Sequence, residues 1–185
     1  TPFEVAAQTF TGTTTMDVAA ITGVLTTTAA TVFNGGFASN AVSTISTADN
    51  LDTLSLISTD ADANSGPNLR LYRNSGSPAD GDAIGLIEFE GRNDNSQDVV
   101  YASIDARVVD ASDGTEDGRI ELGTILGGAA GISRILMDGT ETVFNDNSAD
   151  LDFRVESDNS THALFVEGSS GNVGINTTNP SDYYS

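Results

Sequence analysis

The stretch from Ile84 to Asn145 contains five short apolar runs, separated by clusters of Asn, Asp, Gly and Ser. The runs read IGLIEFEG (84–91), DVVYASIDARVV (98–109), GRIELGTIL (118–126), ISRILMDG (132–139) and TETVF (140–144). Short apolar runs that alternate with turn-forming clusters are typical of an antiparallel β-meander. The stretch therefore predicts an all-β fold, with an antiparallel meander or sandwich module at its centre.

The longest run also predicts which side chains share one face of the sheet. A largely apolar set alternates with a mixed set that includes Tyr101, Asp105 and Arg107, as expected of a sheet with one core face. A slip by one residue would turn the apolar set to water, so the register is well specified. The apolar set consists of Val100, Ala102, Ile104, Ala106 and Val108.

Three segments follow from the composition along the chain. Residues 1–48 are rich in Thr, Ala and Val, which predicts an N-terminal arm or shaft of extended β-structure. Residues 49–141 predict the meander or sandwich module, with additional strands at Asn50–Ser58 and Asn68–Arg73. Residues 142–185 predict a C-terminal β shaft segment in which apolar and polar residues alternate.

The chain is poor in apolar side chains. Hydrophobic residues make up 38% of its 185 residues, against roughly 45–50% in an average globular domain, a range that also counts Gly. Such a chain buries only a modest core by itself, and burial between subunits supplements burial within them. We therefore expect an assembly, with a loosely packed monomeric sandwich as the alternative.

The charge excludes two classes of partner. The net charge is −20, and all seven basic residues are Arg. A surface of this sign repels the phosphates of nucleic acids and disfavours anionic membranes. We therefore expect no nucleic acid binding. Because the sequence also contains no run of 18 apolar residues, we expect no membrane insertion either.

Cysteine is absent and His162 is the single histidine, which excludes disulfides, thiolate sites and multi-His zinc sites within one chain. The chain begins at Thr1 without Met or a basic and apolar signal region. We expect either that its start has been removed or that it is a fragment of a longer chain.

One loop imitates the start of a calcium site. Asp60, Asp62 and Asn64 place oxygen ligands at alternate positions, as a hard cation requires. The following Gly66 falls one place late, and Leu71 stands where a calcium loop has its bidentate Glu. The pattern therefore favours a turn capped by its own side chains, with Ca²⁺ as the weaker alternative; no other cofactor is expected.

The sequence offers only weak patterns for catalysis. Glu88 and Glu90 lie two residues apart on one predicted strand, a spacing compatible with a glycosidase pair, but no Trp is present to stack on a sugar. Asp158, Ser160 and His162 lie within five residues and cannot readily form a linear relay. We expect a protein that is not an enzyme.

The C-terminal sequence is more specific. NSADLDFRVESDNSTHALFVEGSSGNVGINTTNPS, from 147 to 181, closely resembles segments of tail-fibre and related virion structural proteins of tailed bacteriophages, especially marine ones. In that family a stretch G-N-V-G-I-G-T-x-x-P-S often precedes a self-cleaving intramolecular chaperone domain. Residues 171–175 and 177–181 match this stretch, whereas Asn176 stands where the family usually has Gly. With the similar stretches 56–102 and 140–145, the resemblance covers roughly residues 50–181.

The resemblance implies an intertwined β-rich homotrimer on a virion. Its partners would be other tail or capsid proteins and a glycan or protein of the host surface. Whether a chaperone domain follows, was cleaved or is absent stays open. The hypothesis is a trimeric tail fibre or fibre segment, with a capsid decoration protein or head fibre as the alternative and a glycan-cleaving tailspike as the third. The residues expected at the threefold interface are Leu151, Phe153, Val155, Phe165 and Val166.

Overall fold

The computed structural model of the chain describes residues 38–180 and divides it into two units, Thr1–Ile57 and Ser58–Ser185. Most of the predicted N-terminal arm, residues 1–37, lies outside the described residues. Its last part, residues 38–48, is exposed and forms no strand.

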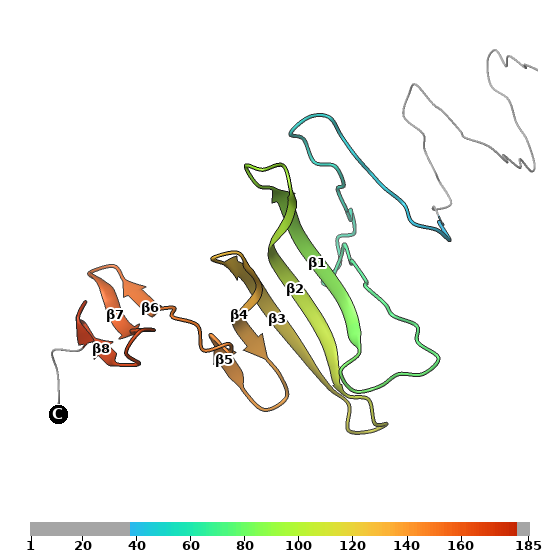
Figure 1. The fold of residues 1–185 in the computed structure, drawn as a ribbon. Helices are drawn as coiled ribbons and strands as arrows, with labels where there is room; N and C mark the ends of the chain where they lie inside the picture. Colours follow the sequence, from blue (N-terminus) through green and yellow to red (C-terminus); the bar gives the residue numbers. More distant parts are fainter. Residues whose placement is uncertain (1–37, 181–185) are drawn as a thin grey trace, which may run out of the picture. The chain divides into compact units, whose positions relative to one another are not determined.

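The second unit is built from antiparallel sheets, which confirms the predicted all-β class. Strands make up 42% of the described residues, which contain no α-helix. A five-stranded sheet has the order β1-β2-β3-β4-β5, so each strand pairs with its neighbour in sequence (Figure 1). Its strands are β1 (Ala83–Arg92), β2 (Asp98–Asp110), β3 (Asp117–Leu126), β4 (Ala129–Met137) and β5 (Thr142–Phe144).

A smaller sheet follows and has the order β6-β7-β8. β6 (Phe153–Ser157) and β7 (Ser160–Val166) form a tight hairpin, and β8 (Val173–Ile175) pairs with the far side of β7. Within residues 38–180, no helix is long and apolar enough to cross a membrane.

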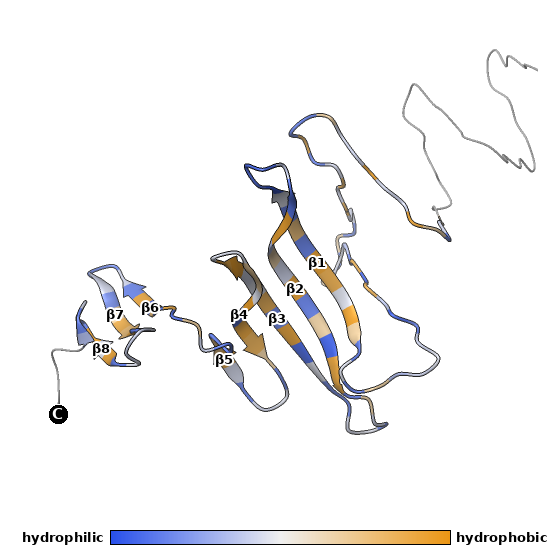
Figure 2. Cartoon of the chain, in the orientation of Figure 1, coloured by the Kyte–Doolittle hydropathy of each residue, from blue (hydrophilic) through white to orange (hydrophobic). Residues whose placement is uncertain are grey.

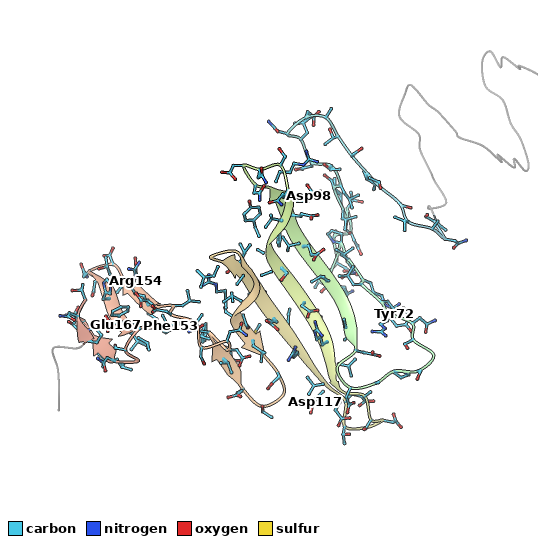
Figure 3. The ribbon with its side chains drawn as sticks, viewed as in Figure 1. Tyr72, Asp98, Asp117, Phe153, Arg154 and Glu167 are labelled. Atoms are coloured by element: carbon cyan, nitrogen blue, oxygen red, sulfur yellow. The ribbon has the colours of Figure 1, made fainter. Side chains whose placement is uncertain are left out.

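The strands predicted at Asn50–Ser58 and Asn68–Arg73 do not form, and that prediction was wrong. Neither segment gains a partner strand, and the second is attached to the start of β1 by side chains. The Arg73 guanidinium donates to the carbonyl oxygen of Ala83 at 2.9 Å and pairs with Asp82 at 3.1 Å. Figure 3 shows Tyr72 in this segment, ahead of β1.

Two further details of the five-stranded sheet differ from simple alternation. β5 lies in the segment predicted as a C-terminal shaft, yet it pairs with β4 and belongs to the large sheet. A register shift in the β1–β2 ladder leaves Tyr101 unpaired, so that Phe89 pairs with Ala102 and Glu90 with Val100. Because a bulge residue shifts the alternation by one, Val100 lies on the opposite face from Ala102.

The chain buries little of its own apolar surface. Among the described residues, the buried hydrophobic side chains are Leu136 and Phe165, which are 7% and 5% exposed. Orange and blue bands alternate along the long strands, as expected of a sheet with one apolar and one polar face (Figure 2). The five-stranded sheet is therefore a single layer, and the described residues add no second layer over its apolar side.

Candidate interaction surface

One face of the five-stranded sheet carries an uninterrupted apolar row. Directly paired residues face the same side of a sheet, so the ladder registers show which side chains meet. A single row crosses all five strands and consists of Ile87, Ile104, Leu122, Ile135 and Phe144. Its neighbouring rows are Phe89-Ala102-Thr124-Ile132 and Ala106-Ile120-Met137-Thr142. We call these three rows the apolar face.

The apolar face is open to solvent in the single chain. Phe89 is 56% exposed and Phe144 is 50% exposed, and Ile87, Ile120 and Met137 are also exposed. Near the β1 end, Leu71 lies against Gly85, where an added Cβ atom would come within 3.1 Å of the Leu71 side chain. That contact covers one corner of the sheet and leaves the rows themselves uncovered.

The acidic side chains within the strands lie on the other side of this sheet. Leu86 and Asp105 are paired, and so are Asp105 and Glu121, which places both carboxylates opposite the apolar rows. Glu88 pairs with Ser103 on the same side. We call this the charged face. The apolar rows are therefore free of carboxylates, although the chain has a net charge of −20.

Four charged residues form a network on the charged face. Asp105 lies opposite Glu121 and Arg107 lies opposite Arg119, so that like charges share a row. Pairs along each strand compensate them: Arg107 Nε donates to Asp105 Oδ2 at 2.5 Å, and Arg119 lies 3.8 Å from Glu121. The hydrogen bond to Asp105 raises the pKa of Arg107, and the charges of Asp105 and Glu121 add to this effect.

Glu88 and three residues of this network, Asp105, Arg107 and Glu121, line a hollow of about 450 Å³ on the charged face. Glu90, which has a spacing from Glu88 compatible with a glycosidase pair, does not line this hollow. The network's side chains already pair with one another. Leu86, Val100 and Ala130 also line the hollow, and its geometry alone indicates no substrate.

The three-stranded sheet divides the expected interface residues between its two faces. Phe153 pairs with Val166, which pairs with Val173, and Val155 pairs with Leu164, so these residues share one face. Phe165 pairs instead with Arg154 and Gly174 on the opposite face. The structure thus brings Phe153, Val155 and Val166 together and separates Phe165 from them.

The burial of Phe165 has a local cause. A Cβ atom added to its paired residue, Gly174, would lie 2.6 Å from Thr177 Cγ2 and 3.2 Å from Pro180 Cβ. The segment after β8 therefore crosses the face on which Phe165 lies. The His162 ring also packs edge-on against Phe165, with 5.0 Å between ring centroids. Phe165 is buried by its own chain.

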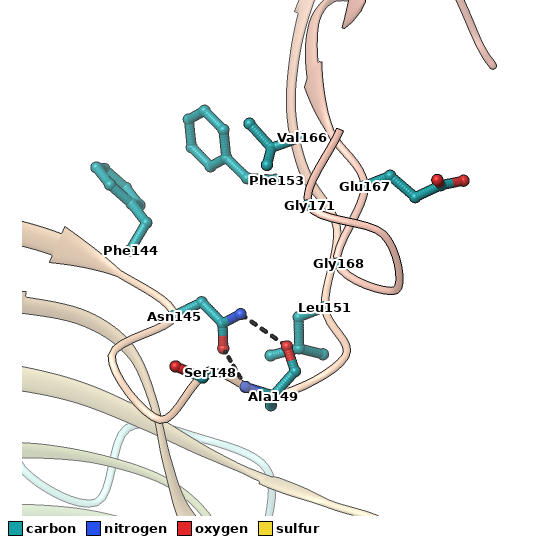
Figure 4. Close-up of a pocket in the computed structure, with 10 residues that line it drawn as sticks. All are labelled: Phe144, Asn145, Ser148, Ala149, Leu151, Phe153, Val166, Glu167, Gly168 and Gly171. Carbon is teal, nitrogen blue, oxygen red and sulfur yellow. Dashed lines mark hydrogen bonds between the residues drawn. The ribbon is translucent and has the colours of Figure 1, made fainter. Parts of the chain in front are cut away.

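Leu151 lies in a hydrogen-bonded turn between β5 and β6, beside a hollow of about 380 Å³ (Figure 4). Asn145 begins the turn with a left-handed φ of 65°, and its side chain bonds both backbone groups of Ala149. Phe144 and Phe153 pack at 4.9 Å between ring centroids beside this turn. Asn147 Oδ1 accepts a bond from the Ser133 amide at 2.5 Å, which attaches the turn to β4.

The calcium candidate folds as a chain of side-chain turns. Asn64 donates to Asp62 through its backbone amide and through Nδ2, both at 2.8 Å. The backbone hydrogen bond from Asn64 lowers the pKa of Asp62, and the bond from the Asn64 side chain lowers it further. Asp60 accepts a longer bond from the Asp62 amide at 3.4 Å. This arrangement is that of a self-capped turn.

Comparison with known proteins adds no relative: no family model, curated protein or solved structure matches the chain. The open apolar face is the feature that sequence reasoning missed as a candidate site. Its signal was present, because the apolar alternation of the runs between 84 and 144 gives its rows once the pairing of strands is known.

Proposed function

We propose that this chain is a structural subunit of a bacteriophage virion, a trimeric tail fibre or fibre segment that attaches the particle to its host. The observation that carries the proposal is the open apolar face, in a structure whose residues 38–180 include only two buried hydrophobic side chains. In this proposal other subunits complete the sheet, because residues 38–180 supply too little burial for a stable fold. The resemblance of residues 147–181 to virion fibre proteins supports the class of assembly.

The remaining surface suits an exterior role. The charged face and the loops carry most of the net charge of −20, which keeps an assembled particle soluble. Exposed loops such as residues 112–116 present backbone and polar groups to the outside. In the proposed fibre, such loops meet a glycan or protein of the host surface, and the sheets hold them in place.

Two measurements test this function. Native mass spectrometry of the full chain should give a species of three times the 19.1 kDa chain mass. Tailed-phage particles that contain the chain can be identified by mass spectrometry of their proteins. An antibody against the chain should label the tail of these particles in electron micrographs. Label on the head would replace the fibre by the capsid decoration protein, and unlabelled particles would contradict a virion role.

A further inference from the structure

We propose that copies of this chain pack against one another through the apolar face of the five-stranded sheet. The inference rests on the proposed assembly of identical subunits and names the surface that makes it. The sequence predicted the interface between subunits in the C-terminal segment. The inference instead assigns this interface to the rows that contain Ile104, Leu122 and Phe89.

The size of the apolar face supports an interface between subunits. A strand residue covers about 16 Å² of a sheet, since strands lie about 4.8 Å apart and rise about 3.4 Å per residue. The 45 residues of β1 to β5 thus give each side of the sheet about 700 Å², of which the 13 residues of the apolar face, each spanning two strand positions, cover about 420 Å². The apolar face is thus as large as the largest patch on a typical monomer, roughly 300–600 Å², and the whole side of the sheet around it approaches the roughly 800 Å² per partner of a stable interface.

The distribution of charge supports a second copy as the partner. Two chains of net charge −20 repel each other over most of their surface. They can meet closely only where acidic side chains are absent, and the apolar rows are such a place. The charged face is unsuited to the same role, because packing there would remove Asp105, Arg107 and Glu121 from water at a high desolvation cost.

The dependence of the fold on a partner also favours self-association. A fold whose residues 38–180 bury two hydrophobic side chains needs its partner whenever it is folded. An identical copy is present wherever the chain is made, and homo-oligomers with closed symmetry are the commonest assemblies of soluble proteins. Around a symmetry axis, the same rows of each copy face one another.

Two residues of β1 provide a matched pair for the test. Phe89 lies on the apolar face and is 56% exposed in the single chain, whereas Leu86 lies on the charged face and is 51% exposed. In an isolated chain the two side chains are therefore nearly equivalent. Phe89→Asp should weaken self-association about 100-fold or more, because the interface would bury a carboxylate; Leu86→Asp should leave it unchanged. Analytical ultracentrifugation over a range of concentrations measures both.

A second measurement applies even if Phe89→Asp fails to fold. The chain has no Cys, so Phe89→Cys and Leu86→Cys each carry a single thiol. In the assembled protein a maleimide should label Phe89→Cys at least about tenfold more slowly than Leu86→Cys. A tenfold difference corresponds to a free energy of about 1.4 kcal/mol for opening the interface.

The outcomes separate this inference from the proposed function. An assembled wild type whose two aspartate variants associate alike, or whose two thiols react alike, overturns the apolar face and leaves the assembly standing. A monomeric wild type at micromolar concentration overturns both. A monomeric wild type with a protected Phe89→Cys thiol would place a segment of the same chain on the face, which also overturns the proposal.

Discussion

The five-stranded and three-stranded sheets share antiparallel pairing but differ in how their faces are covered. The small sheet closes one face with its own chain, where Thr177 and Pro180 cross over Gly174 beside the buried Phe165. Its 15 strand residues leave an apolar face of about 240 Å², an ordinary size for a monomer surface. The large sheet leaves about 700 Å² open. Local burial thus stabilises the small sheet, whereas residues 38–180 leave the apolar rows of the large sheet uncovered.

The largest expected effect tests the local burial of the small sheet. Phe165→Ala should lower the free energy of unfolding by about 3–5 kcal/mol, because it empties the space that the ring fills under the segment after β8. Denaturant unfolding followed by circular dichroism at fixed protein concentration measures the loss.

Val173→Ala is the control for this change, since Val173 is 60% exposed on the opposite face of the same sheet. It should cost well under about 1 kcal/mol. Equal losses in the two variants would contradict local burial and would place both faces of the small sheet in one interface.

The next effect concerns the close approach of two backbone segments at the edge of the small sheet. A Cβ atom added at Gly168 would lie 2.4 Å from the backbone nitrogen of Leu151, which cannot move aside as a flexible side chain can. Gly168→Ala should therefore destabilise the protein by about 2–3 kcal/mol in the same unfolding measurement. Gly76→Ala serves as the control, because an added Cβ there meets nothing within 4 Å. A neutral Gly168→Ala would show that Leu151 is not held against the sheet.

A smaller effect is expected at the turn between the two sheets. Asn145→Ala loses two hydrogen bonds to Ala149 and forces a residue with a Cβ into φ 65°, so it should cost about 2 kcal/mol. Asn145→Gly loses the same bonds but accepts this φ, and should cost about 1 kcal/mol. Thermal unfolding with probes in each sheet measures both. If the two variants lose equal stability, backbone conformation contributes nothing at this turn.

The smallest effect is a pH dependence within the large sheet. The hydrogen bond from the Thr140 amide lowers the pKa of Asp138 in the β4–β5 turn, with further bonds from the Thr140 side chain and the Glu141 amide. A carboxyl with a lowered folded pKa stabilises the fold above its unfolded pKa of about 3.9, and the contribution is lost as pH falls through the folded pKa.

Asp138→Asn removes this titration, so the thermal midpoint of the wild type should exceed that of the variant at pH 6 and approach it at pH 3. Comparing the two proteins cancels the titration of the other carboxylates. A gap that stays constant from pH 6 to pH 3 would show that the Asp138 charge contributes nothing.

Much of the meander could be predicted from the sequence, because alternation and turn residues are local signals. The run 98–109 became β2 and the run 118–126 became β3, each within one residue at either end. Pairing is not local. Val100 faces the charged side because Tyr101 bulges out of the β1–β2 ladder, and nothing in the run reveals which partner will shift its register.

The same limit explains the candidate site. NLDTLSLIS and NLRLYR have strand-like alternation, yet no strand pairs with them, and extended segments without partners are not strands. Phe165 was grouped with Phe153 and Val155 as an interface residue, although the hairpin register turns it to the other face. Which apolar face stays open depends on which other segments cross it, as Thr177 and Pro180 cross the face of Phe165, and the runs alone do not encode this.

The strand order has a consequence for how the protein forms. Each strand of the large sheet pairs with the strand beside it in sequence, so no pairing waits for a distant segment. Hairpins close in about 1–10 μs, and folds rich in local contacts form quickly. The sheet can therefore grow strand by strand as the chain leaves the ribosome. In the proposed assembly, the slow step is an encounter between chains. Its rate rises with chain concentration, and it competes with aggregation through the same uncovered rows.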